Sequence, residues 1–347
     1  MKRVPSPQQL LRRAGFPWTA PPVPMGVLPA EKPSVVGAEF ETDWARTPAA
    51  RTFRWVLHEA VLEPAVRLMA DPTRRGLDRL AHLDGKQPLI FVANHHSHLD
   101  TPLLLRRLPR PWRTKLFVGA AADYFFPNRI AGSAAALALN AIPIERTRVN
   151  RRSALAAADL IADGWSMLIY PEGGRSPDGW GQEFKGGAAY LAIRQEVPVV
   201  PVHISGTDKI LPKGSNRPRP GSTVLSFGEP IVARPGEDAR RLSVRIEAGV
   251  AALADEATSD WWQARQRAHA GQTPSLAGPD VVSWRRAWLR SDPARTRPTR
   301  AIGSGRRRPI PAAGIETPAG QGPGVDGPSR PALPALQDTR YPRWPRI

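Results

Sequence analysis

Short apolar runs alternate with amphipathic stretches through the middle of the chain. The apolar runs predict strands at residues 88–93, 114–119, 141–145, 166–170, 198–204 and 222–227. The stretches between and after them have helical spacing and predict helices at residues 97–107, from 130 onward, and at 152–163, 185–195 and 238–254. Because strands that alternate with helices form layered sheets, the pattern predicts an α/β domain with a mainly parallel sheet flanked by helices.

Residues 50–70 have the spacing of an amphipathic helix, with apolar side chains among Arg51, Arg54 and Arg67. We expect Pro64 to kink this helix. The pattern fits packing on the domain and binding at a membrane interface equally well. The chain has no run of 18 or more uncharged apolar residues, so we expect no membrane-spanning helix.

A polar turn rich in histidine connects the strand 88–93 to the helix 97–107. His95 follows the strand directly, and Asp100 lies five positions later. Because the chain reverses between them, Asp100 can return beneath the imidazole, accept its N–H and fix its tautomer. A histidine oriented in this way can remove a proton from an attacking hydroxyl without a Ser or Cys nucleophile. We interpret His95 and Asp100 as a candidate catalytic pair.

Two other interpretations of this turn stay open. The histidines can be ordinary solvated side chains. Alternatively, His96, His98 and Asp100 fit the H-x-H-x-D start of the two-zinc signature of metallo-β-lactamase-like hydrolases. That signature continues with another histidine, whereas Thr101 stands here and only two histidines follow farther along the chain. We expect no metal site.

A second polar turn, Tyr-Pro-Glu-Gly-Gly-Arg-Ser at residues 170–176, follows another predicted strand. Its two glycines let the backbone approach an anion closely. Arg175, with Lys185 farther on and Arg146 after an earlier strand, offers donors to a phosphate. The structural alternatives are an ordinary loop and a surface ion pair between Arg146 and Glu145.

Four sequence blocks occur in order. They are Asn94-His95-x-Ser97-x-x-Asp100, the run 141–146 that closes in Arg146, the turn 170–176 followed by Phe184-Lys185-Gly186-Gly187, and the apolar run 197–202. Together they resemble the glycerolipid acyltransferase family, whose best-known member is 1-acylglycerol-3-phosphate acyltransferase. The resemblance covers about residues 50–255. Many members differ at Pro143 and Glu145, and the family pattern has Phe at Tyr170 and Thr at Gly174.

The resemblance makes His95 and Asp100 the catalytic pair. It implies that His95 removes a proton from the hydroxyl of a lysophospholipid, here 1-acylglycerol 3-phosphate, which then attacks a thioester. The acyl donor is expected to be acyl-CoA or acyl carrier protein, with no bound cofactor or metal. The expected substrate-binding residues are Asn94, Ser97, Arg146, Glu172, Gly173, Arg175 and Lys185.

The predicted strand order places this chemistry at one edge of the sheet. His95, Arg146 and Glu172 each follow directly on a predicted strand. Ligands of such sheets gather at the carboxyl ends of the strands. We therefore expect a single site at that edge.

The composition narrows the function classes. The chain has no cysteine, which excludes disulfides, thiolate metal sites and cysteine nucleophiles. Its net charge is +18, and residues 281–347 carry 13 arginines against 4 acidic residues. Such a basic segment can be attracted to an anionic membrane surface or to nucleic acid. Since the site points to phospholipid, we favour the membrane over nucleic acid.

We expect four segments along the chain. They are a loosely ordered N-terminal arm (1–45), an acyltransferase domain (46–256), an amphipathic extension rich in Trp and Arg (257–290) and a disordered basic tail rich in Pro and Gly (291–347). The tryptophans of the extension suit a lipid interface or packing on the domain. The opening residues lack the apolar core of a secretory signal. We therefore expect a cytoplasmic enzyme on the inner face of the cell membrane.

A non-enzymatic alternative remains, namely a basic lipid- or nucleic-acid-binding protein on a degenerate acyltransferase scaffold. Such a scaffold is expected to have lost a catalytic position. Because both His95 and Asp100 are present, the sequence favours the enzyme.

Overall fold

The computed structural model describes residues 37, 39–145, 151–176, 179–212, 217–278 and 281. Its contacts divide the chain into Met1–Thr299 and Arg300–Ile347, and the second unit lies wholly outside the described residues. The predictions for most of the N-terminal arm, for Arg146 and for the basic tail therefore concern residues that the structure does not describe.

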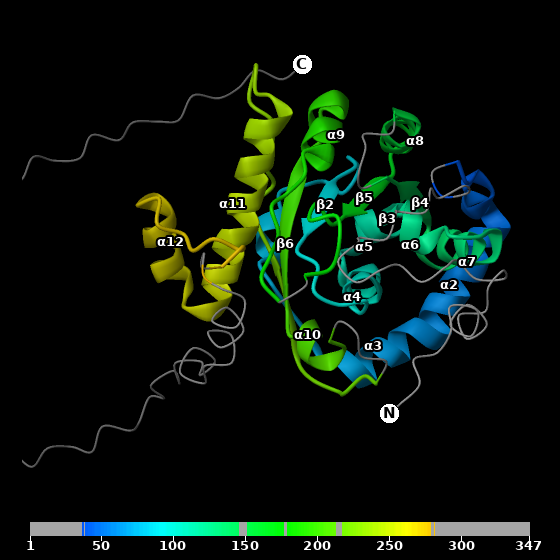
Figure 1. The fold of residues 1–347 in the computed structure, drawn as a ribbon, viewed down its shortest axis with the longest axis horizontal. Coiled ribbons are helices and arrows are strands. Elements are labelled where there is room, and N and C mark those ends of the chain that lie inside the picture. Colours follow the sequence, from blue (N-terminus) through cyan, green and yellow to red (C-terminus); the bar gives the residue numbers. More distant parts are fainter. Residues whose placement is uncertain are drawn as a thin grey trace, which may run out of the picture. The chain divides into compact units, whose positions relative to one another are not determined.

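Seven strands form one sheet in the order β1-β7-β6-β2-β5-β3-β4. The strands are β1 (Pro72–Arg75), β2 (Ile90–Ala93), β3 (Leu116–Ala121), β4 (Ala141–Ile144), β5 (Ser166–Ile169), β6 (Val199–Ser205) and β7 (Thr223–Phe227). Neighbouring strands are parallel except β6 and β7, which are antiparallel. The layered, mainly parallel sheet predicted from the sequence is confirmed (Figure 1).

Apolar side chains on both faces of the strands create two cores. In β2, Phe91 and Ala93 belong to one core, and Ile90 and Val92 to the other, because successive strand residues point to opposite faces. The first core also takes side chains from α3 (Glu63–Ala70), α4 (Asp100–Arg107) and α5 (Arg110–Arg113). The second takes them from α8 (Arg151–Ala162), α9 (Gly187–Gln195) and α11 (Ala239–Thr258). Each fully buried large apolar side chain stabilises the fold by about 1.5–3 kcal/mol.

The amphipathic segment 50–70 is one continuous helical stretch. It consists of α2 (Pro48–Leu57), the π-helical turn η2 (His58–Leu62) and α3. Where a kink was predicted at Pro64, the structure has the wide turn just before it, in which the N–H of Glu63 donates to the carbonyl of His58. The chain thus stays helical past a residue that has no N–H of its own.

One face of this helical stretch packs on the C-terminal end of α7 (Arg129–Leu139). The Arg54 guanidinium donates to the carbonyls of Leu137 (2.7 Å), Ala136 (3.1 Å) and Ala45 (2.6 Å). His58 Nε2 lies 2.8 Å from the carbonyl of Ala138. Burial lowers the pKa of Arg54 to about 10, so the side chain stays charged at neutral pH, where a cation at a helix C-terminus is favourable.

Residues at the end of the predicted N-terminal arm also pack on the domain. The ring of Phe40 lies 5.5 Å from that of Phe126, and Ala45, in the 3-10 helix η1 (Asp43–Arg46), is fully buried. Residues 40–45, which the sequence analysis assigned to the N-terminal arm, therefore include positions that pack on the domain.

We expect Arg54→Met to destabilise the domain by about 2–4 kcal/mol. Methionine keeps much of the side-chain volume but leaves three buried carbonyls without their donor. Chemical denaturation measures the change. Arg129→Met, at an exposed position on α7, is the matched control and should shift stability by less than about 0.5 kcal/mol. Equal stability of the two variants would contradict the assignment.

An ion cluster fixes the far end of α4, the helix that begins with Asp100. Glu63 binds Arg67 (2.6 Å), Arg106 (2.8 Å) and Arg107 (2.8 Å). Burial acts to raise the pKa of Glu63, but the hydrogen bonds from these arginines outweigh it and hold the pKa at about 2. The cluster therefore ties α3 to α4 at neutral pH.

Several elements were not predicted, among them one strand and one C-terminal helix. The edge strand β1 pairs with β7, although its sequence, Pro-Thr-Arg-Arg, has no apolar alternation. The helix α12 (Trp261–His269) follows α11, and Arg267 binds Asp255 there through two contacts of 2.7 Å. Among the described residues, no helix combines the length and apolar character needed to cross a bilayer.

Candidate active site

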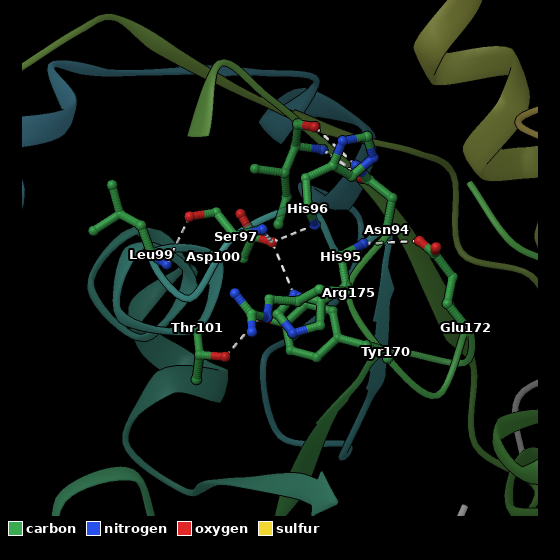
Figure 2. Close-up of polar contacts among 12 residues, drawn as sticks. Asn94, His95, His96, Ser97, Leu99, Asp100, Thr101, Tyr170, Glu172 and Arg175 are labelled. Carbon is green, nitrogen blue, oxygen red and sulfur yellow. Dashed lines mark hydrogen bonds and ion pairs between the residues drawn. The ribbon is translucent and has the colours of Figure 1, made fainter. Parts of the chain in front are cut away.

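The site forms where two neighbouring strands end. Because β2 and β5 are parallel and paired, the turns that follow them, 94–97 and 170–176, lie side by side (Figure 2). Two hydrogen bonds to the backbone of His95 join the turns. Its carbonyl accepts from the N–H of Ser176 (2.9 Å), and its N–H donates to Glu172 Oε1 (2.8 Å).

His95 and Asp100 form the predicted contact. The distance from His95 Nδ1 to Asp100 Oδ2 is 2.8 Å, and the same oxygen accepts the backbone N–H groups of His96 and Ser97, also at 2.8 Å. Asp100 is fully buried in the first turn of α4, where the helix dipole favours a negative charge. An acceptor at Nδ1 directs the ring proton to that nitrogen, which leaves Nε2 able to take a proton.

Tyr170, which the sequence analysis did not include among the site residues, stacks on the imidazole of His95. The ring centroids are 4.1 Å apart and the planes differ by 19°. The Tyr170 hydroxyl lies 3.0 Å from Thr101 Oγ1. Burial, followed by the charge of Asp100, raises the pKa of Tyr170 well above its ordinary value, so the hydroxyl keeps its proton. In the sequence, the signal for a role of Tyr170 is its place as an aromatic residue at the start of the glycine turn.

Glu172, which was predicted to bind substrate, joins the two turns. Its side chain is buried, and its oxygens accept the backbone N–H groups of His95 (2.8 Å) and Gln182 (3.0 Å). Burial raises the pKa of Glu172 to about 7; these two hydrogen bonds lower the pKa, while the charges of Asp100 and Glu247 add to the rise. A carboxyl so enclosed and bonded holds the backbone of both turns in place.

This pKa gives a prediction for Glu172→Gln. A carboxyl whose pKa rises from 4.5 to about 7 on folding contributes stability below pH 4.5 that is lost as the pH rises through 7. Glutamine does not titrate, so the free energy of unfolding of the wild type minus that of the variant should fall by about 3 kcal/mol from pH 4.5 to 8. Urea denaturation at several pH values measures this difference. A difference independent of pH would contradict the assignment.

Asn94 and Ser97 also have structural roles where substrate binding was predicted. The Asn94 amide donates to the carbonyl of Ile204 (2.9 Å) and accepts its N–H (2.7 Å), which bridges the ends of β2 and β6. The Ser97 hydroxyl donates to the carbonyl of Leu211 (2.8 Å). Both side chains are buried and bonded to protein backbone.

Two of the three predicted cations lie among the described residues. Gly173 has φ 73°, and a Cβ placed there would come within 2.8 Å of Lys185 Nζ, so the turn carries the ammonium close to its backbone. Arg175 lies beside the histidine turn (Figure 2). Burial, followed by the charge of Arg175, lowers the pKa of His98. Arg146 lies outside the described residues.

The three residues of the H-x-H-x-D pattern have different partners. His98 Nε2 lies 2.9 Å from the hydroxyl of Tyr124, whereas Asp100 binds His95. Burial, followed by the charge of His96, lowers the pKa of His203 to about 3. Within the described part of the chain, no three His, Asp or Glu side chains are arranged to hold a metal ion.

Comparisons with known proteins point to one family. A family model described as Acyltransferase matches residues 72–205. A 1-acyl-sn-glycerol-3-phosphate acyltransferase of Chlamydomonas reinhardtii is 35% identical over 144 residues, which are 40% of this chain and 41% of that protein. The chloroplastic enzyme BAT2 of Brassica napus is 34% identical over 41% of this chain and 39% of its own. The human 1-acyl-sn-glycerol-3-phosphate acyltransferase beta is 32% identical over 35% of this chain and 42% of its own length.

Among solved structures, the 1-acyl-sn-glycerophosphate acyltransferase PlsC from Thermotoga maritima is similar at 26% identity, with a TM-score of 0.48 over 63% of this chain and 87% of that one. The chain spans about two fifths of the length of the curated relatives that it matches. The family model begins at β1 and ends with β6, so it includes both turns of the site. Residues 72–205 therefore match the Acyltransferase family model, and the relatives that align with this chain are named 1-acyl-sn-glycerol-3-phosphate acyltransferases.

Proposed function

We propose that this protein transfers a fatty acyl group from a thioester donor, acyl-CoA or acyl carrier protein, to the free hydroxyl of 1-acylglycerol 3-phosphate. The observation that carries the proposal is the 2.8 Å contact of His95 with the buried Asp100, beside a glycine turn that includes Arg175 and lies against the side chain of Lys185. The names of the relatives support the choice of acceptor.

In the proposed reaction, His95 Nε2 takes the proton of the acceptor hydroxyl as its oxygen attacks the thioester carbonyl. A C–O bond forms, and the tetrahedral intermediate then collapses with cleavage of the C–S bond. The imidazolium returns its proton to the departing thiolate, so His95 ends as it began. Asp100 holds Nδ1–H throughout and stabilises the positive charge that develops on the ring.

The two described cations suit the phosphate of the acceptor. A guanidinium offers paired donors to a phosphate and an ammonium adds a compact charge. In the proposal, Arg175 and Lys185 hold the phosphate so that the neighbouring hydroxyl meets His95. Arg146 is proposed as a third contact on the strength of the sequence alone.

We expect Arg175→Met to raise the KM for 1-acylglycerol 3-phosphate by roughly 10- to 100-fold, since a charge-assisted phosphate contact contributes about 1.5–3 kcal/mol. The KM for the acyl donor should change by less than about threefold. Initial-rate kinetics with each substrate varied in turn separates the two. Arg219→Met, at an exposed position outside the site, is the control. Equal effects on both KM values would argue against a role in phosphate binding.

We propose that the enzyme works at a membrane surface. The helical stretch from α2 to α3 packs on the domain by one face and leaves large apolar side chains exposed on its surface. They are Phe53, Trp55, Val56, Val61 and Leu68. Exposed apolar side chains on a surface helix support binding at a lipid interface, where the acceptor resides.

The proposed function is tested by assaying the purified full chain against glycerol 3-phosphate and a panel of lysophospholipids. Each acceptor is presented in anionic or zwitterionic vesicles with either acyl-CoA or acyl carrier protein. Product should form from 1-acylglycerol 3-phosphate, and faster on anionic vesicles. Vesicle binding without transfer to any acceptor would overturn the proposal and favour the lipid-binding alternative.

A further inference from the structure

We infer that Tyr170 is a positioning residue, which holds the imidazole of His95 in the orientation that acyl transfer requires. The inference rests on the proposed function and extends the machinery beyond the His95–Asp100 pair. It starts from the stack of Tyr170 on His95, with centroids 4.1 Å apart and planes 19° apart.

The stack restrains a motion that Asp100 leaves free. The contact of Asp100 with Nδ1 fixes one edge of the ring, but a ring held at one edge can still tilt about that contact. A second aromatic ring lying against its face blocks the tilt on that side. Edge and face together define where Nε2 points.

The Tyr170 ring is itself anchored. Its hydroxyl lies 3.0 Å from Thr101 Oγ1, and Thr101 follows Asp100 in the first turn of α4. The carboxylate at the edge of His95 and the anchor of the ring on its face therefore come from consecutive residues of one helix (Figure 2). Since the far end of α4 is fixed by the ion cluster around Glu63, both contacts are held by one rigid element.

The hydroxyl distinguishes this chain from the family pattern, which has Phe at the position of Tyr170. A phenyl ring can stack but cannot bond to Thr101. We therefore assign two contributions: the ring covers the imidazole face, and the hydroxyl fixes the ring. Removing the ring should cost more than removing the hydroxyl.

The test compares kcat and KM for Tyr170→Leu, Tyr170→Phe, Thr101→Val and the double variant Tyr170→Phe/Thr101→Val. A misplacement of about 1 Å can cost about 100-fold in rate, so Tyr170→Leu should lower kcat by roughly 10- to 100-fold with both KM values within about twofold. Tyr170→Phe and Thr101→Val should each lower kcat by about two- to fivefold. The double variant should match the single ones, because both remove the same hydrogen bond.

Tyr190→Leu is the matched control, because Tyr190 is an exposed tyrosine of α9. Its hydroxyl accepts a hydrogen bond from Arg194 on the same helix. Tyr190→Leu should leave kcat unchanged. A folded Tyr170→Leu protein with the kcat of the wild type would overturn the inference. So would a raised KM at constant kcat, which would make Tyr170 a substrate contact.

A second readout separates this inference from the proposed function. NMR relaxation of the His95 ring reports its mobility in the absence of substrate. A rigid ring is expected in the wild type and Tyr170→Phe, and a more mobile ring in Tyr170→Leu, because Asp100 still binds Nδ1 there but nothing blocks the tilt. If the wild type transfers no acyl group, the proposed function fails, and an equally rigid ring in Tyr170→Leu would then overturn the inference independently.

Discussion

Replacement of His95 by alanine is expected to lower kcat for acyl transfer by roughly 10²- to 10⁴-fold, the contribution of a positioned general base. The fold should survive the change. The contacts of His95 with Glu172 and Ser176 run through its backbone, so alanine keeps both. Steady-state kinetics on wild type and variant measures the effect, and circular dichroism checks the fold.

The control for this variant is His82→Ala, because His82 is exposed and lies outside the site. It should keep the kcat of the wild type. A folded His95→Ala protein that retains more than about a tenth of the wild-type kcat would show that another group takes the proton.

The second large effect is expected for Asp100→Asn. Three N–H groups converge on Oδ2 of Asp100 at 2.8 Å, and an asparagine must present either one oxygen or an NH₂ group to them. If the amide oxygen of the asparagine stays with the two backbone N–H groups, the uncharged amide holds the ring proton on Nδ1 of His95 less strongly than a carboxylate does. We expect kcat to fall by about 10³- to 10⁴-fold, the cost of the wrong tautomer in such pairs.

Asp100→Asn should also destabilise the domain by about 1–3 kcal/mol, because a buried donor loses an acceptor of full charge. Thermal unfolding measures this change alongside the kinetics. Asp159→Asn, at an exposed position on α8, should alter neither quantity. Wild-type kcat in a stable Asp100→Asn protein would remove Asp100 from the mechanism.

Much of the sheet could be predicted because its strands are apolar on both faces. In β2, all four residues are buried, and such a run between turn residues has few other interpretations. The strand β1 escaped prediction for the opposite reason. Its charged residues are exposed, and it becomes a strand only because β7, about 150 residues later, lies beside it. Information of that kind is not local to the sequence.

In the site, too, contacts between residues close in the sequence could be predicted and contacts between distant residues could not. The contact between His95 and Asp100 was predictable because it spans five residues of one turn. The roles of Asn94 and Ser97 were not, because their partners, Ile204 and Leu211, lie more than 100 residues away. A motif indicates which residues are important, whereas the pairing of distant strands determines which partners their side chains contact.

Glu172 and Tyr170 also have a partner, His95, that is distant in the sequence. Both come after β5, and both meet His95 only because β5 pairs with β2. The resemblance placed Glu172 in substrate binding, whereas in the structure its oxygens accept backbone N–H groups. The two turns nevertheless lie side by side at the carboxyl ends of β2 and β5, where the sequence analysis expected one site.

The central claim is that His95 activates the acceptor hydroxyl for direct attack on the donor. It is tested most directly by single-turnover mixing, in which excess enzyme is loaded with acyl-CoA and 1-acylglycerol 3-phosphate is added last while free thiol is followed. The account predicts that thiol appears only after the acceptor is added, together with an equal amount of diacylated product, and that His95→Ala yields neither on the same timescale. Thiol release before the acceptor is added, or equal release by His95→Ala, would contradict it.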